Sequence, residues 1–143
     1  NNMGAVSIVG NVNSSFAAKQ PGFVGTVKKP AAEGGYYAVY ATPEHGVAAA
    51  SKLLERYGRS GTTSPIRIVS KWSEDKRAHG TYAKTLVKYL RQAGYDVDAN
   101  TKLDLADADV RVAILKAKSA HESGAGKPVY SDDVFEKGAH YDF

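Results

Sequence analysis

The spacing of apolar residues changes near residue 42, and this change limits the folds that the chain can adopt. Before this point, residues 6–9 and 36–40 are short apolar runs of the kind that form strands, and turn-forming residues flank them. After it, apolar residues recur every three or four positions, as on one face of a helix. We therefore predict an α+β fold that is mainly α, with a small N-terminal β lobe over residues 1–41 and a helical body over residues 42–143.

Capping residues divide the helical body into five predicted helices, which start near residues 43, 65, 81, 108 and 132. Thr42 before Pro43 is typical of a helix start, because threonine caps a free N–H group and proline fits the first turn. Gly58 and Gly94 are expected to end the first and third helices. The helix after Asp107 has a wide apolar surface, so we expect it to be central. The β lobe and the helical body together leave room for a cleft between them.

The composition is that of a single folded domain. The 143 residues are 43% hydrophobic and 24% charged, which is enough to bury a core. Cysteine is absent, which excludes disulfides and thiolate metal sites. No run approaches the roughly 18 apolar residues of a membrane span, and no secretory signal pattern is present. The net charge of +4 attracts anionic polymers.

Several common kinds of site have no signature in the sequence. Basic residues are spread along the chain, so we expect no specific nucleic-acid partner, although a basic nucleic-acid-binding module stays open as a third reading. Neither a glycine-rich phosphate loop nor a nucleophile-elbow motif occurs, so we expect no cofactor and no serine triad. We also expect no metal, because metal-ligand spacing is lacking among the four histidines, His45, His79, His121 and His140.

A Glu-Ser-Gly turn, with Glu122 as its first residue, lies at the predicted end of the fourth helix. The negative end of the helix dipole disfavours an ionised carboxylate, and burial would act in the same direction. A carboxylic acid that stays neutral near pH 6–7 can protonate the leaving oxygen of a glycosidic bond. The alternative is that Glu122 is a solvated residue before a glycine C-cap.

A second carboxylate is less well defined by the sequence. Glu44 lies in the first turn of a predicted helix, where the dipole favours the ionised form, so the two acids could take separate roles. Stabilisation of that helix explains Glu44 equally well. Glu33, in a glycine-flanked loop, is a further candidate. A mechanism with one glutamate also stays open, in which an acetamido group or a 6-hydroxyl of the substrate is the nucleophile.

Aromatic residues supply candidate sugar contacts. Tyr36, Tyr37 and Tyr40 share one predicted strand and must point to both of its faces, so at least one ring is expected to be exposed. Exposed tyrosine rings stack on sugars, but tyrosine is also an ordinary strand residue. We take Tyr37 and Tyr40 as the candidates. Trp72 and Tyr57 lie on apolar helix faces, and we expect both in the core.

Short motifs occur along nearly the whole chain in a recognisable order. They are Asn-Asn at residues 1–2, Thr-Pro-Glu-His-Gly at 42–46, Leu-Leu-x-x-Tyr at 53–57, Ile-Val-x-x-Trp at 68–72, Thr-Tyr at 81–82, Leu-Asp-Leu at 103–105, His-Glu-Ser-Gly at 121–124 and Pro-Val-Tyr at 128–130. In this order they resemble a family of phage virion proteins and cell-wall lytic enzymes. A partial resemblance to bacterial glucosaminidases of the lysozyme superfamily has the Glu-Ser-Gly and Asn boxes in the opposite order. We therefore expect a circularly permuted lysozyme-like fold.

The resemblance implies a phage-derived enzyme that cleaves the β-1,4 glycan backbone of peptidoglycan, with Glu122 as acid and base and Glu44 as a second carboxylate. By position in the family pattern, Asn2 and Tyr130 would contact the glycan. Other virion proteins are implied as further partners. The implied location is the virion or the host cytoplasm, with action on the cell wall in the periplasm. The alternative is a non-catalytic virion or cell-wall-binding protein with the same fold.

Overall fold

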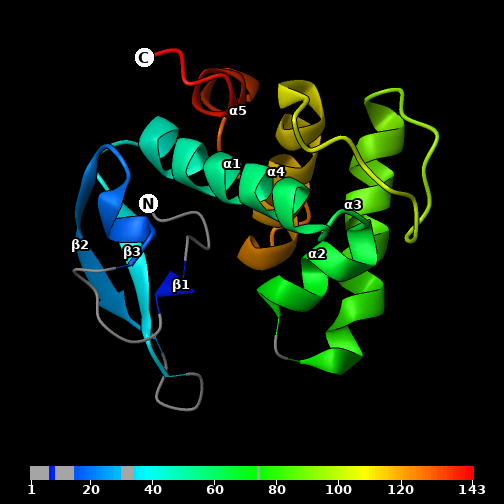
Figure 1. Ribbon diagram of the computed structural model, residues 1–143, viewed down its shortest axis with the longest axis horizontal. Helices are drawn as coiled ribbons and strands as arrows, with labels where there is room; N and C mark the ends of the chain where they lie inside the picture. The colour runs from blue at the N-terminus through cyan, green and yellow to red at the C-terminus, as the bar shows by residue number, and fades with distance from the viewer. Residues whose placement is uncertain (1–6, 9–14, 30–33, 74) are drawn as a thin grey trace.

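The molecule is mainly helical, with a small β part formed by its N-terminal strands (Figure 1). The predicted fold class is therefore confirmed. Among the residues that the structure describes, no helix is long and apolar enough to cross a membrane. The computed structural model describes residues 7–8, 15–29, 34–73 and 75–143.

The strands form one antiparallel sheet in the order β1-β3-β2. Their bounds are Ser7–Ile8 for β1, Phe23–Lys28 for β2 and Tyr36–Tyr40 for β3. The sequence does not predict β2, because its apolar residues do not alternate toward the core. Val24 and Val27 are 63% and 50% exposed, so neither provides the buried face that marks a strand.

The α-helices are α1 (Pro43–Ser60), α2 (Pro65–Trp72), α3 (His79–Gln92), α4 (Ala108–Ser123) and α5 (Asp132–Ala139). Two short 3-10 helices, η2 (Ala17–Lys19) and η3 (Lys76–Ala78), lie before β2 and before α3. Four of the five predicted helix starts are confirmed, and α3 begins two residues earlier than predicted. The side chains of Thr42, Ser64 and Asp107 each accept a hydrogen bond from the first turn of α1, α2 and α4. These caps explain why the starts could be located from the sequence.

The predicted end of α1 at Gly58 is wrong. The helix continues to Ser60 and ends at Gly61, whose φ of +84° is the left-handed conformation that glycine tolerates best. Gly58 has a different function in the fold. A Cβ atom at this position would lie 3.1 Å from the Cβ of Leu105, so the missing side chain lets the segment after α3 approach α1 closely.

Helix α4 lies at the centre of the helical body, as predicted. Its residues 110–120 are all buried except Lys116, and it packs against α1, α3 and α5. In Figure 1, α1 runs from the sheet toward α2 and α3, and it crosses α4 on the way. The C-terminal end of α4 therefore comes close to α2 and α3, which supply the neighbours of Glu122.

Candidate functional site

Glu122 lies in the last turn of α4, and the predicted helix end is confirmed. Gly124 caps the helix with a φ of +71°, and its N–H group donates to the carbonyl of His121. The main chain is exposed at this point, but only 24% of the Glu122 side chain is exposed. The carboxylate is therefore largely covered while one part of it still reaches solvent.

Two donors hold the Glu122 carboxylate, and both bind the same oxygen. The hydroxyl of Tyr82 and the ammonium of Lys118 donate to Oε2, the latter at 2.6 Å. Lys118 lies one turn earlier on α4, and its side chain is only 5% exposed. Burial, followed by the charge of Glu122, raises the pKa of Tyr82, so this hydroxyl stays protonated and acts as a donor. Among the described residues, no donor bonds Oε1.

Aromatic rings lie beside the ion pair of Lys118 and Glu122. The His121 ring stacks on Tyr82 with centroids 3.9 Å apart, and the Trp72 ring lies 5.9 Å from Tyr82. The Lys118 ammonium lies 4.8 Å from the centroid of the Trp72 ring, a cation–π contact. The Tyr57 side chain of α1 lies near both Trp72 and Tyr82, which brings α1 to the same group. We call this set the Glu122 cluster: Tyr57, Trp72, Tyr82, Lys118, His121 and Glu122.

The Glu122 carboxylate has a neighbour that the helix-end prediction did not include. The Lys118 ammonium lies 2.6 Å from it. Lys118 in turn benefits from the carboxylate, because a buried ammonium is costly without compensation. The cluster therefore places a carboxyl group and an amino group in direct contact, close enough for proton transfer.

The two helix-end carboxylates are not neighbours. Glu44 occupies the first turn of α1, as predicted. Its surroundings come from α5, since its carbonyl oxygen would lie 2.8 Å from a Cβ atom at Gly138 and its charge acts on Lys137. In the described part of the chain, Glu44 is not among the residues that contact Glu122. Glu33 lies outside the described residues.

The structure does not support Tyr40 as a sugar-contacting residue. Its side chain is buried in the core, where the hydroxyl donates to the carbonyl of Ala17 at 2.9 Å. Burial raises the pKa of Tyr40, so the phenol stays neutral. Ala38 and Tyr40 lie two positions apart in β3, and both point toward the core. The sequence predicts that alternate residues share a face, but it does not say which face is buried, because that depends on where the sheet packs.

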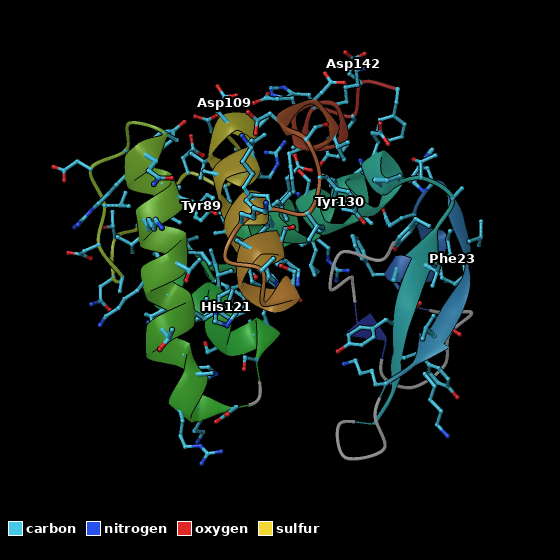
Figure 2. The ribbon with its side chains drawn as sticks, turned by 180° about the vertical axis from the view of Figure 1, so that it is seen from behind. Phe23, Tyr89, Asp109, His121, Tyr130 and Asp142 are labelled. Atoms are coloured by element: carbon cyan, nitrogen blue, oxygen red, sulfur yellow. The ribbon has the colours of Figure 1, made fainter. Side chains whose placement is uncertain are left out.

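The other predicted sugar contacts lie at separate places. Tyr37 is half-buried in β3, and the Lys29 ammonium lies 5.0 Å from its ring centroid. Tyr130 is half-buried between α4 and α5, with its ring 6.1 Å from that of Phe135 (Figure 2). Asn2 lies outside the described residues. Neither described tyrosine belongs to the Glu122 cluster.

The core prediction for Trp72 and Tyr57 is only partly correct. Both are half-buried and pack against the core, but their rings also take part in the Glu122 cluster. A tryptophan or tyrosine on an apolar helix face keeps one polar atom, and that atom needs a partner when it is covered. The sequence indicated the packing of these residues, whereas their contact with each other depends on tertiary structure.

A shallow hollow of about 330 Å³ lies between α3 and α4, next to the cluster. Figure 2 shows Tyr89 and His121, which border it from the two helices. His121 and Gly124, which line the hollow, are one and two positions from Glu122 in the sequence, but Glu122 itself does not line it. The full lining is Thr85, Lys88, Tyr89, Ala120, His121, Gly124 and Gly126.

A second group of polar side chains was not anticipated. Asp109 in the first turn of α4 lies close to Glu136 and His140, and their candidate ligand atoms all lie within 4.8 Å of one another. Glu136 and His140 are four residues apart, a spacing that places two side chains on one helix face and was visible in the sequence. The approach of Asp109 depends on the packing of α4 against α5, which the sequence alone does not give.

The sequence matches no family model, and a search of curated proteins gives no match. The family resemblance inferred from the order of short motifs therefore remains a hypothesis, and any function has to be argued from the geometry of the site.

Proposed function

We propose that this protein is a glycosidase that cleaves the β-1,4 glycan backbone of peptidoglycan, with Glu122 as the proton-transferring residue. The proposal is supported by one arrangement: a carboxylate at a helix end, fixed through Oε2 by Lys118 and Tyr82, with aromatic rings beside it. Aromatic rings next to a positioned carboxylate suit a sugar substrate, because a ring face stacks on a sugar while the acid reaches the bridging oxygen.

Lys118 gives Glu122 a route to the protonated form that the acid role requires. When a glycan covers the cluster and excludes water, burial disfavours both charges of the ion pair. A proton can then pass from the Lys118 ammonium to Glu122 along their 2.6 Å contact. Glu122 gives this proton to the bridging oxygen as its bond to the anomeric carbon breaks. The carboxylate then takes a proton from the attacking water or sugar hydroxyl, and Lys118 is recharged.

The net charge of the chain suits the same substrate class. The charge of +4 attracts anionic polymers, and bacterial cell walls are among them. As part of this proposal, the helical body with its small β part corresponds to a circularly permuted lysozyme-like fold. Phage origin and the virion as location belong to the same proposal, because they come from the motif resemblance.

A glutamine substitution at Glu122 tests the assignment. Glu122→Gln keeps the size of the side chain and an acceptor for Lys118 and Tyr82, but it cannot carry a proton through the reaction. We expect release of soluble fragments from purified peptidoglycan to fall about 10²- to 10⁴-fold, the usual contribution of general acid–base catalysis. Asp96→Asn, at an exposed position between α3 and α4, is the matched control and should leave the rate unchanged.

Two results would contradict this assignment. Unchanged fragment release by Glu122→Gln would exclude Glu122 as the catalytic group. If the wild type releases nothing from peptidoglycan, the glycosidase proposal itself fails. Mass spectrometry of the released fragments identifies which bond is cut and whether the new end is reducing or an anhydro sugar.

A non-catalytic cell-wall-binding or virion protein is the second candidate. The ion pair favours it, because an ionised carboxylate that stabilises a buried lysine has a structural function without any reaction. Co-sedimentation with insoluble peptidoglycan separates the candidates. Binding without fragment release, equal in the wild type and in Glu122→Gln, would support the binding protein.

A further inference from the structure

Asp109, Glu136 and His140 bring three metal-ligating side chains together on the side of the molecule formed by α4 and α5. Asp109 is in the first turn of α4, Glu136 is in α5, and His140 follows the last residue of α5. Figure 2 shows Asp109 at the end of α4 that lies next to α5. His140 Nε2 lies 3.4 Å from Asp109 Oδ1 and 3.5 Å from Glu136 Oε2.

These separations match the edges of a tetrahedral zinc site. Zinc binds histidine nitrogen and carboxylate oxygen at about 2.0–2.2 Å, so two ligands at the tetrahedral angle lie about 3.3–3.6 Å apart. The two distances from His140 fall in this range. The carboxylates of Asp109 and Glu136 lie within 4.8 Å of each other, and their side chains are 69% and 50% exposed, so small rotations can close the third edge.

The charge balance of the cluster also favours a cation. Two lysines of α4 and α5 pair with other carboxylates, since Lys116 pairs with Asp132 at 3.0 Å and Lys137 pairs with Asp133 at 3.2 Å. Within the described ranges, His140 is the one ion-pair partner of Asp109 and of Glu136. Within the described residues, the cluster thus brings two carboxylates together with no lysine or arginine paired to either.

We propose that Asp109, Glu136 and His140 form a binding site for a divalent transition metal, with zinc as the best-fitting ion and water as the remaining ligand. The imidazole nitrogen favours zinc over magnesium and calcium, which prefer sets of oxygen ligands. The bound ion would link the start of α4 to the C-terminal end of α5. The proposal is independent of the function proposed for Glu122, because the two clusters lie at opposite ends of α4.

Zinc titration of the chelator-treated protein by isothermal calorimetry tests the site. We expect one zinc ion to bind each wild-type chain, and magnesium chloride to give no comparable signal. Loss of a residue that hydrogen-bonds to a metal ligand weakens metal binding about tenfold or more. Loss of the ligand itself in His140→Gln should weaken zinc binding at least as much. Asp109→Asn should do the same. Asp75→Asn, which changes an exposed carboxylate just before η3, is the control and should bind zinc like the wild type.

Thermal unfolding supplies a second readout that does not depend on any activity. Zinc should raise the Tm of the wild type and of Asp75→Asn, because a ligand that binds the folded state stabilises it, and it should not raise the Tm of His140→Gln. Equal zinc affinity of His140→Gln and the wild type would overturn the proposal, as would a wild type that binds no zinc. Circular dichroism checks that His140→Gln is folded. If it is not, the result for Asp109→Asn decides.

Discussion

At the scale of single residues, Lys118 and Glu122 share one ion pair but differ in burial. The Lys118 side chain is 5% exposed and the Glu122 side chain 24%. Removal of the carboxylate takes away one of the groups that compensate a buried ammonium, whereas removal of the ammonium affects a carboxylate that can turn toward water. The fold should therefore depend more on Glu122 than on Lys118.

We expect Glu122→Ala to lower the free energy of unfolding by about 1.5–3 kcal/mol, the usual range for a hydrogen bond to a charged group. Lys118→Met should lower it less, because methionine keeps the apolar stem that packs beside Trp72. Urea unfolding of both variants measures the difference. Losses of equal size, or a larger loss for Lys118→Met, would contradict this account of the pair.

Part of this cluster could be foreseen from the sequence. Lys118 and Glu122 are four residues apart on a predicted helix, and such pairs face each other. The helix dipole, on which the prediction for Glu122 was based, is a weaker effect than a neighbouring charge. Tyr82 lies 40 residues away from Glu122 in the chain, and its contact depends on how α3 packs on α4. No local pattern contains that information.

At the scale of elements, α1 and α5 pack so closely that their contact requires a glycine. A Cβ atom at Gly138 would lie 2.6 Å from the Cβ of Val47 and 2.8 Å from the carbonyl oxygen of Glu44. One of these neighbours is main chain and cannot rotate away. The absence of a side chain at this position therefore sets the distance between the two helices.

Alanine substitutions at two helical glycines should act in opposite directions. Gly138→Ala should destabilise the protein by about 1–3 kcal/mol, the usual range for overpacking, because α5 must move away from α1. Gly80→Ala in α3 meets no atom within 4 Å and should stabilise by about 0.5–1 kcal/mol, since alanine restricts the unfolded chain. Thermal unfolding of both variants tests the prediction. Stabilisation by Gly138→Ala would show that α1 and α5 are less tightly packed.

Most helix starts could be predicted, and the failures have a common cause. Thr42, Ser64 and Asp107 act on their own first turns, so the signal is local. Gly58 carries the same local signal as a helix-ending glycine, but its function is to make room for Leu105, which lies far along the chain. Strand β2 was missed for a related reason, because pairing with β3 defines it and burial of its own residues does not.

At the scale of the whole molecule, a buried arginine joins the C-terminal segment to the helical body. The Arg111 guanidinium donates to Ser51 at 2.7 Å and to the carbonyls of Leu105 and Ala139 at 3.0 and 3.2 Å. These bonds satisfy a charge that would otherwise be costly to bury. They connect α1, the segment before α4, α4 itself and the end of α5.

Tyr141 completes this connection, and it should make the stability of the molecule sensitive to alkaline pH. Its hydroxyl donates to Glu55 at 2.7 Å, and its φ of +59° is a conformation that tyrosine rarely adopts without support from its surroundings. Burial raises the pKa of Tyr141 to about 12, the Glu55 carboxylate acts in the same direction, and the hydrogen bond with Ser51 opposes them. The neutral phenol is thus favoured in the folded state.

The sign of the pH dependence follows from this shift. A tyrosine in the unfolded chain titrates near pH 10, so the contribution of Tyr141 is fully present below about pH 10 and is lost as the pH rises toward about 12. The free energy of unfolding should therefore fall more steeply over this interval in the wild type than in Tyr141→Phe. Lysines titrate in the same interval but are common to both proteins, so the difference between the two curves isolates Tyr141. Parallel curves would mean that the Tyr141 hydroxyl does not help to hold the C-terminal segment on α1.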